Sequence, residues 1–268
     1  MMAVIDDKKS INIEEKPSII LLPTIDITTK IRKDGKMKNT RSNKKKDERA
    51  IVFAFDTEEK IKNMLEIFNK HIMKANTETR EHRARRNKLA FLIGISIGIR
   101  AGDFVKLKWN YFIESLKPDG TIGKFRDYYD LKPEKQKKQN KFVRLYFNQT
   151  VKQAIIEYTI NFPIKDLDDY VFFSTNISDG HMEYHAFYEM LKKTAKEAGI
   201  EENIGTHSLR KTWGFWCWHN AVDKSKALVT LQQCFNHSSV QTTLKYIGLL
   251  DVEIKEMYDS MELGLKYM

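Results

Sequence analysis

The stretch "NKLAFLIGISIGIR" (residues 87–100) carries the most structural information in this 268-residue chain. Apolar residues occupy nearly every direction around its helical wheel, which predicts a helix that is buried on all sides. Gly98 permits the left-handed backbone that commonly ends a helix, so we expect the helix to stop there and Arg100 to follow it. These features predict a mainly helical fold built around this segment.

Helical patterns continue on both sides of the apolar stretch. Upstream, "FDTEEKIKNMLEIFNKHI" (55–72) begins with Asp56 and Glu59 in the spacing of a capping box. Immediately downstream, "AGDFVKLKW" (101–109) predicts a third helix. Helical periodicity then returns at 149–161 and again from residue 182 to the end of the chain.

In the middle of the chain the pattern changes to a period of two. "KFRDYYDL" (124–131) and "KFVRLYF" (141–147) flank the polar stretch "KPEKQKKQN", which predicts a β-hairpin. "YVFFS" (170–174) predicts one further short strand. The expected fold is therefore mainly α with a small antiparallel β-sheet, an α+β domain.

The overall composition limits the class of protein. The chain is 41% hydrophobic and 31% charged, and none of its apolar runs approaches the about 20 residues of a membrane span. The polar start does not fit a signal peptide, so we expect a cytoplasmic location. The protein is then either associated with the nucleoid or encoded by a virus or plasmid. A net charge of +10 favours a polyanionic partner such as DNA or RNA.

Much of this charge lies near the start of the chain. Residues 30–49 contain ten Lys or Arg and three Asp or Glu, with almost no large apolar residue, which is typical of a disordered segment. We expect residues 1–50 to form a basic tail in which Lys44, Lys45 and Lys46 contact nucleic acid. Residues 51–268 then form one folded domain.

Several short stretches hold side chains that bind or attack phosphate. Two arginines can neutralise the charge of a pentacovalent phosphorane through bidentate hydrogen bonds. His207 and Arg210 are three residues apart and share one face of a helix, where the histidine either takes a proton from a hydroxyl or caps the start of the helix. A tyrosine is a poor nucleophile at pH 7, because its phenol pKa is about 10. A neighbouring base and a cluster of cations can activate it. The candidates are Arg100, Lys138, His207, Arg210, His237 and Tyr246.

Together these stretches resemble the tyrosine recombinase (phage integrase) family, whose catalytic set runs Arg, Lys, His-x-x-Arg, His, Tyr. "GIRAGDFVKLKW" (98–109) resembles its first arginine box, with Asp103 in the place of the usual glutamate. "THSLRKTW" (206–213) resembles the His-x-Leu-Arg box. "NHSSVQTTLKY" (236–246) resembles the box that ends in the nucleophile, with Asn236 in place of glycine. The resemblance covers residues 52–250.

The resemblance implies a mechanism that needs neither a metal nor a cofactor. Arg100, Arg210 and His237 would bind the scissile phosphate, and Tyr246 would attack it with help from His207 to form a 3′-phosphotyrosyl bond. Family spacing selects Lys138 as the acid that protonates the 5′-hydroxyl, with Lys135 and Lys137 as open alternatives. Asp103 would support the site, and further DNA contacts are expected from Lys135, Lys137, Lys141 and Lys211.

The resemblance also implies partners. Strand exchange between two duplexes requires double-stranded DNA and four protomers, and it involves neither a membrane nor a small-molecule substrate. Residues 249–268 predict an amphipathic helix that packs on its own domain or on a neighbouring protomer, and Tyr246 serves its own site or a neighbour's. The motifs fit integration, excision, inversion and dimer resolution equally. Enzymes of this kind are carried by mobile elements. The family's N-terminal DNA-clamping domain is not expected in this chain, whose basic tail would take its place.

Three other interpretations compete with this one. A type IB topoisomerase shares the catalytic set but carries a separate capping lobe, and a catalytically silent DNA-binding regulator should have lost at least one reactive residue. An RNA-binding protein is supported by charge alone. We interpret "WGFWCWHN" (213–220) as helix core, with Trp213, Trp216 and Cys217 on one face, and we assign no metal to His82 or His219.

Overall fold

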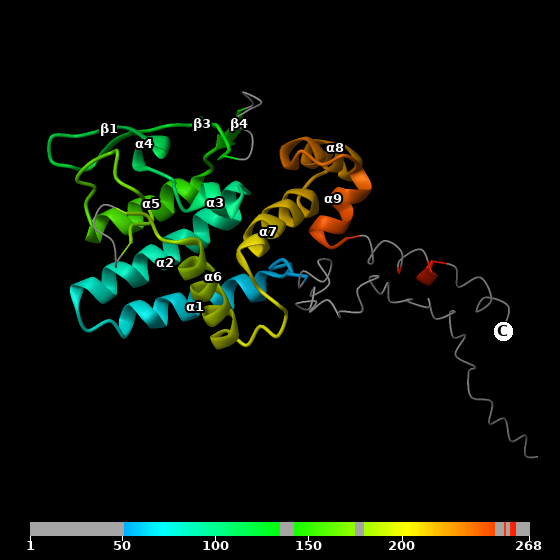
Figure 1. Cartoon of the computed structure of the whole chain (residues 1–268), viewed down its shortest axis with the longest axis horizontal. Coiled ribbons are helices and arrows are strands. Elements are labelled where there is room, and N and C mark those ends of the chain that lie inside the picture. Colours follow the sequence, from blue (N-terminus) through cyan, green and yellow to red (C-terminus); the bar gives the residue numbers. More distant parts are fainter. Residues whose placement is uncertain (1–50, 135–141, 175–179, 250–254, 256–257, 261–268) are drawn as a thin grey trace, which may run out of the picture. The chain divides into compact units, whose positions relative to one another are not determined.

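The computed structural model describes residues 51–134, 142–174, 180–249, 255 and 258–260 (Figure 1). Its helices are α1 (Glu58–Met73), α2 (Glu78–Ile97), α3 (Ala101–Phe104), α4 (Trp109–Phe112), α5 (Gln149–Asn161), α6 (Tyr184–Glu197), α7 (Thr206–His219), α8 (Lys224–Phe235) and α9 (Val240–Ile247). Its strands are β1 (Ile113–Leu116), β2 (Ile122–Phe125), β3 (Tyr128–Leu131) and β4 (Val143–Tyr146). The mainly helical α+β fold that the sequence predicts is confirmed.

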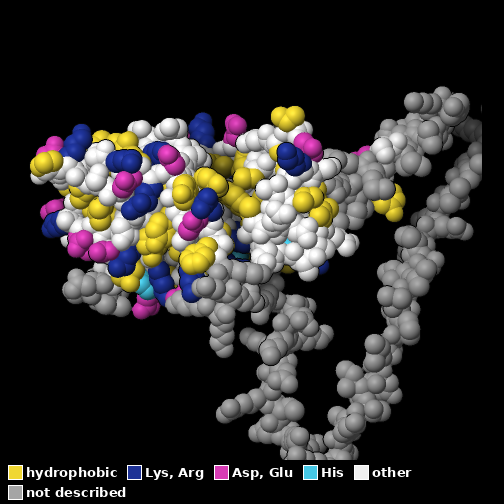
Figure 2. All heavy atoms as spheres, turned by 90° about the horizontal axis from the view of Figure 1, so that it is seen from above, with side chains coloured by type: hydrophobic (Ala, Val, Ile, Leu, Met, Phe, Trp, Pro, Cys, Tyr) yellow, Lys and Arg dark blue, Asp and Glu magenta, His cyan; other side chains and the backbone are white. Residues whose placement is uncertain are grey.

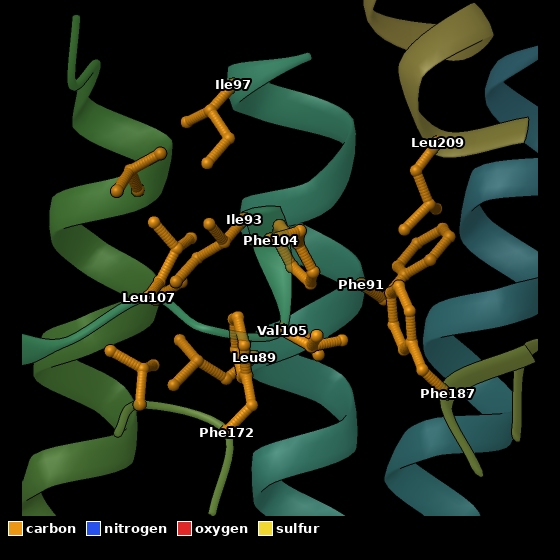
Figure 3. Packing of buried hydrophobic residues seen from close by; sticks show 14 of the residues in the cluster. Leu89, Phe91, Ile93, Ile97, Phe104, Val105, Leu107, Phe172, Phe187 and Leu209 are labelled. Atoms are coloured by element: carbon orange, nitrogen blue, oxygen red, sulfur yellow. The ribbon is translucent and has the colours of Figure 1, made fainter. Parts of the chain in front are cut away.

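Helix α2 is the centre of the main hydrophobic core. It packs against α1, α5 and α7, and it lies between α1 and α5 in Figure 1. Figure 3 shows Phe91 of α2 pointing toward Phe187 and Leu209, and Ile93 pointing toward Leu107. The helix ends at Gly98, whose φ of 62° lies in the left-handed region, as predicted. The apolar stretch therefore forms the core helix expected from its pattern.

Threonine side chains cap both of the first two helices. Thr77 accepts a hydrogen bond from the backbone of Arg80, so α2 begins well before its apolar part. Thr57 does the same for Lys60, so the cap of α1 is Thr57 and the predicted cap at Asp56 is wrong by one residue. Asp56 instead forms an ion pair with the side chain of Lys60 (2.8 Å).

The strands form two separate ribbons rather than one sheet. β3 pairs with β4 in antiparallel register from Tyr128↔Tyr146 to Leu131↔Val143, which confirms the predicted hairpin. β2, which includes the first part of the predicted strand at 124–131, pairs with β1 and not with the hairpin. The prediction of one small sheet is therefore corrected to two. The predicted strand at 170–174 makes only isolated bridges, at Tyr170 and Phe173.

The predicted third helix is interrupted after one turn. α3 ends at Phe104, and the next segment pairs with a distant part of the chain: the N–H of Val171 donates to the carbonyl oxygen of Leu107 (2.9 Å). This long-range pairing competes with helix continuation, so a second short helix, α4, starts at Trp109. Arg100 and Asp103 are thereby held in a short, rigid turn.

Helices α7, α8 and α9 share a smaller second cluster. Its buried residues are Leu231, Phe235, Ile247 and Leu249. Trp213 packs edge-on against Phe235 at 5.6 Å between ring centroids, and Trp216 donates its indole N–H to the carbonyl oxygen of Phe55 (2.8 Å). The core interpretation of 213–220 thus holds for Trp213, which packs partly buried on the small cluster; Trp216 is half-buried outside both clusters, and for Cys217, which is exposed, the interpretation is wrong.

The surface of the described residues carries both signs of charge. In Figure 2, Lys and Arg side chains are interspersed with Asp and Glu on the face in view. Residues 30–49, which contribute a net +7 to the chain's +10, lie outside the described residues. Among the helices that the structure describes, none combines the length and the apolar character needed to cross a bilayer.

Candidate active site

Arg210 is the most enclosed member of the predicted catalytic set. Its side chain projects from α7 and is 8% exposed. Nη1 donates a hydrogen bond to the carbonyl oxygen of Gly98, and the guanidinium carbon lies 4.5 Å from the centre of the Phe235 ring. Burial lowers the pKa of this guanidinium, as does the charge of Arg100, while Tyr246 raises it. Arg210 is therefore fixed between the end of α2 and the end of α8.

Arg100 and Arg210 line the same cavity, whose volume is about 210 Å³. Gln233, Cys234 and Asn236 of the α8 end form another part of its wall. The two arginines come from positions 110 residues apart in the sequence, and the meeting of α2, α3 and α7 brings them together. Two guanidiniums at one opening provide the bidentate donors that a phosphodiester requires.

Asp103 connects this cavity to the β3–β4 hairpin. Its Oδ1 accepts a hydrogen bond from the backbone N–H of Glu134 (2.9 Å). Pro133 and Phe142, which bracket residues 135–141 in this part of the chain, line the cavity beside Asp103. The supporting role expected for Asp103 stays a prediction, and this contact indicates how it would act.

Tyr246 projects from α9 toward the two arginines. Its hydroxyl oxygen lies 3.4 Å from Nδ1 of His207, and its ring packs edge-on against Phe235 and His237, with centroids 5.0 and 5.1 Å apart. Burial raises the pKa of the phenol, whereas the hydrogen bond and charge of Arg210 and the charge of Arg100 lower it. The phenol is consequently protonated at neutral pH, and a base must remove its proton before attack.

His207 is the second residue of α7 and lies on its exposed side. Arg210 follows one turn later, so both side chains meet Tyr246, as the three-residue spacing predicts. The start of α7 is closed by Ser208, whose Oγ accepts a hydrogen bond from the backbone N–H of Gly205 (3.1 Å). This bond favours a place for His207 beside the tyrosine over the alternative of a histidine that caps the helix.

His237 follows directly after the end of α8. Asn236 takes the left-handed conformation (φ 56°, ψ 48°) that ends this helix, a conformation that asparagine tolerates and that glycine would adopt in the motif. Nδ1 of His237 lies 3.0 Å from Oγ1 of Thr243. Burial lowers the pKa of the imidazole, and the charges of Arg210 and Arg100 lower it further. Its ring is therefore neutral near pH 7 in the free protein.

The hydroxyl side chains of 236–246 organise the helix of the tyrosine. Ser239 is the cap of α9, and its Oγ accepts a hydrogen bond from the backbone N–H of Thr242 (3.1 Å). Ser239 therefore fixes the start of the helix that carries Tyr246.

Lys211 lies closer to the candidate nucleophile than the sequence suggested. Its Nζ is 5.4 Å from the centre of the Tyr246 ring, and burial lowers the pKa of its ammonium group. We expected this lysine to contact DNA, and that expectation stays a prediction. Its position next to Arg210 in the chain was the available signal, whereas Cys234, which lines the cavity, carried none.

Other predicted site residues lie outside the described residues. Lys138 and the alternatives Lys135 and Lys137 belong to this group, as do Lys141, Lys44, Lys45 and Lys46. In the part of the chain that the structure describes, no three His, Cys, Asp or Glu side chains converge as a metal site would require. His82 lies in an aromatic cluster, where Nε2 is 2.6 Å from the Tyr158 hydroxyl and the ring stacks on Phe162.

Comparisons with known proteins identify the family of this chain. Residues 57–252 match the model of the phage integrase family. The chain is 30% identical over 167 residues to the probable integrase/recombinase YoeC of Bacillus subtilis (strain 168), a match that covers 62% of this chain and 78% of YoeC.

Solved structures share the fold. The crystal structure of XerA recombinase is similar with a TM-score of 0.52 and 20% identity, over 81% of this chain and 65% of XerA. The XerH site-specific recombinase, in a post-cleavage complex with its palindromic difH substrate, gives a TM-score of 0.50 and 19% identity, over 74% of this chain and 51% of XerH. This chain thus spans less than two thirds of either recombinase of known structure.

Proposed function

Because the chain belongs to the phage integrase family, the tyrosine-type site-specific recombinases that break and rejoin DNA, we propose that it cuts and reseals DNA strands through Tyr246. The observation that supports this mechanism most is the position of the Tyr246 hydroxyl, 3.4 Å from a histidine nitrogen and beside two arginines that line one cavity. A base and a pair of fixed cations are what a phenol needs to attack a phosphodiester.

The first step is capture of the scissile phosphate. Arg100 and Arg210 donate to its non-bridging oxygens, and His237, whose ring packs against Tyr246, donates a further hydrogen bond. The arginines stay charged through the reaction, so they stabilise the additional negative charge of the phosphorane. The fixed position of Arg210, set by Gly98 and Phe235, keeps this stabilisation preorganised.

The second step is in-line attack by Tyr246. His207 takes the phenolic proton as the oxygen forms a bond to phosphorus, and the bond from phosphorus to the 5′-oxygen breaks. Lys138 gives a proton to the departing 5′-oxygen. The products are a 3′-phosphotyrosyl ester and a free 5′-hydroxyl, and attack by the 5′-hydroxyl of a partner strand reverses the step. The ester conserves the bond energy, so resealing needs no ATP.

The substrate is double-stranded DNA, and we propose that four protomers assemble on it. The XerH relative was captured with its DNA substrate, which supports the class of substrate. Residues 1–50 act as a basic tail, with Lys44, Lys45 and Lys46 on the phosphate backbone, and 51–268 act as the catalytic domain. The C-terminal segment 249–268 packs on its own domain or on a neighbouring protomer, and the enzyme works in the cytoplasm beside the nucleoid.

An adduct assay tests the mechanism. The wild-type protein is mixed with a pool of nicked duplexes of random sequence, and protein–DNA adducts that survive denaturation are isolated and sequenced. We expect adducts from the wild type and from the matched control Tyr258→Phe, whose tyrosine is 79% exposed, and none from Tyr246→Phe. Adducts at the wild-type level from Tyr246→Phe would refute the assignment of the nucleophile.

The same assay separates the competing interpretations. Enrichment of one sequence among the adducts supports site-specific recombination. Equal adducts on all sequences, together with relaxation of a plasmid, would favour a topoisomerase. Tight DNA binding without any adduct would favour a catalytically silent regulator.

A further inference from the structure

Thr243 is a buried hydroxyl residue one helical turn before Tyr246. Thr243 is 0% exposed, although threonine is mostly found on protein surfaces. Oγ1 lies 3.0 Å from Nδ1 of His237 and 3.4 Å from the carbonyl oxygen of Ser239. A buried hydroxyl with two partners, one of them a member of the catalytic set, is placed to control the state of that histidine.

The hydroxyl has a single proton to donate. The distance to Nδ1 is that of a normal hydrogen bond, whereas the distance to the Ser239 carbonyl is at the outer limit. Donation to Nδ1 makes this nitrogen an acceptor, so the proton of a neutral imidazole must sit on Nε2.

The charges around His237 make the position of that proton important. Arg100 in front of α3 and Arg210 on α7 disfavour a charged imidazole, and burial does so more strongly. The phenol of Tyr246 on α9 contacts the ring from another side, and the Cys234 thiol on α8 lies beside Arg210. A neutral ring presents only one N–H, and a phosphate oxygen can only accept a hydrogen bond.

We propose that Thr243 is a positioning residue that holds His237 in its Nε2–H form, so that this histidine donates a hydrogen bond to the scissile phosphate. The inference rests on the proposed function, because it needs a phosphate at the cavity. Thr243 does not itself touch the reacting atoms, and it acts through the histidine ring.

Conservative variants test the role of the hydroxyl. Thr243→Val keeps the shape and removes the hydrogen bond, and we expect it to slow adduct formation about 10- to 100-fold, as loss of a supporting hydrogen bond commonly does. Thr243→Ser should restore most of the rate. The matched control is Thr242→Val, because Thr242 is exposed and its hydroxyl bonds to Ser239 instead of to the histidine.

The pH dependence distinguishes positioning from packing. At low pH the imidazolium carries protons on both nitrogens, so it can donate with or without Thr243. The ratio of the Thr243→Val rate to the wild-type rate should therefore fall as the pH rises through the pKa of His237, which burial and the two arginines hold below its usual value of about 6.5. Titrating groups other than His237 are the same in both proteins and cancel from this ratio. A ratio that is constant with pH would overturn the proposal.

A double substitution and a spectrum provide further tests. In the His237→Ala background, Thr243→Val should have little additional effect on the rate, because the threonine acts through the histidine. The nitrogen-15 spectrum of wild-type protein should show His237 with an unprotonated Nδ1 at pH 7.5. A protonated Nδ1, or full additivity of the two substitutions, would contradict the inference. If the wild type forms no adduct on any DNA, the proposed function fails, and the spectrum still tests the tautomer separately.

Discussion

The two sides of the candidate site are built into hydrophobic clusters of different size. Arg210 bonds to the end of α2, the helix at the centre of the large core, although its guanidinium also packs on Phe235 of the small cluster. Tyr246 stands on an eight-residue helix that is held mainly by Phe235, Ile247 and Leu249 of the small cluster. Local stability varies with the amount of apolar contact, so the phosphate-binding side should be rigid and the nucleophile should lie on an element that opens more easily.

Phenylalanine truncations in the two clusters should produce the largest effects. Phe91 and Phe235 are 0% and 1% exposed, and replacing either with alanine removes about 3–5 kcal/mol of stability. Phe91→Ala should lower the free energy of global unfolding. Phe235→Ala should instead release α8 and α9 while α2 stays protected, because the two clusters are separate.

Amide hydrogen exchange measures this difference. In the wild type, amides of α9 should exchange faster than those of α2, and Phe235→Ala should widen the gap. If both variants accelerate exchange to the same extent in all helices, the two clusters unfold as one unit and the comparison is wrong.

Arg210→Lys tests the rigid side of the site. Lysine keeps the charge but loses the planar fork that bonds to Gly98 and to the phosphate at the same time. We expect cleavage to slow about 10²–10³-fold, similar to the loss of one oxyanion donor, with DNA binding largely kept. The matched control is Arg126→Lys, which replaces another arginine that donates to a backbone carbonyl (Asn110, 2.9 Å) away from the site. Equal losses from both variants would indicate a general structural effect.

Protonation of His82 should lower the stability of the folded protein at acidic pH. Burial lowers the pKa of this histidine, and the charge of Arg86 lowers it further, so the folded protein binds the proton more weakly than the unfolded chain does. The resulting stability is present above about pH 6.5 and is lost as the pH falls through the lower pKa of the folded state. Urea unfolding at pH 7.5 and 5.5 should show this loss in the wild type and a smaller loss in His82→Gln. The same loss in both proteins would exclude His82 as the cause.

Replacement of Lys211, which lies beside Tyr246, should have the smallest effect on the rate of adduct formation. A cation over an aromatic ring is worth about 0.5–1 kcal/mol, so Lys211→Met should slow adduct formation about two- to fivefold at saturating DNA. Lys211→Arg should retain the rate. Lys245→Met is the matched control, because Lys245 neighbours Tyr246 in the chain but is exposed. A loss that disappears at saturating DNA would identify Lys211 as a DNA contact only.

Local patterns were sufficient to predict the features that depend on neighbouring residues. The buried helix that ends at Gly98, the hairpin of β3 and β4 and the left-handed Asn236 all follow from side-chain spacing and backbone preference. The motif order likewise identified Arg100 and Arg210, which line one cavity, and the pair of Tyr246 and His207.

Features that depend on distant contacts could not be predicted in this way. The break after α3 results from pairing of Leu107 with Val171, and the separation of the sheet results from β2 pairing with β1. The bond between Thr243 and His237 requires the turn between α8 and α9 to bring the two side chains together. Neither spacing nor composition specifies such a contact, because the geometry of the turn decides it.

The bond between Arg210 and Gly98 has a further electrostatic consequence. The last carbonyl groups of a helix lack partners within the helix and form the negative end of its macrodipole. Arg210 donates to such a carbonyl at the end of α2, so the dipole of this core helix offsets part of the cost of enclosing a cation. A side chain at position 98 would collide with the ring of Trp213 and would disfavour the left-handed turn. A substitution of this glycine should therefore both destabilise the end of the core helix and displace the guanidinium of Arg210 from the site.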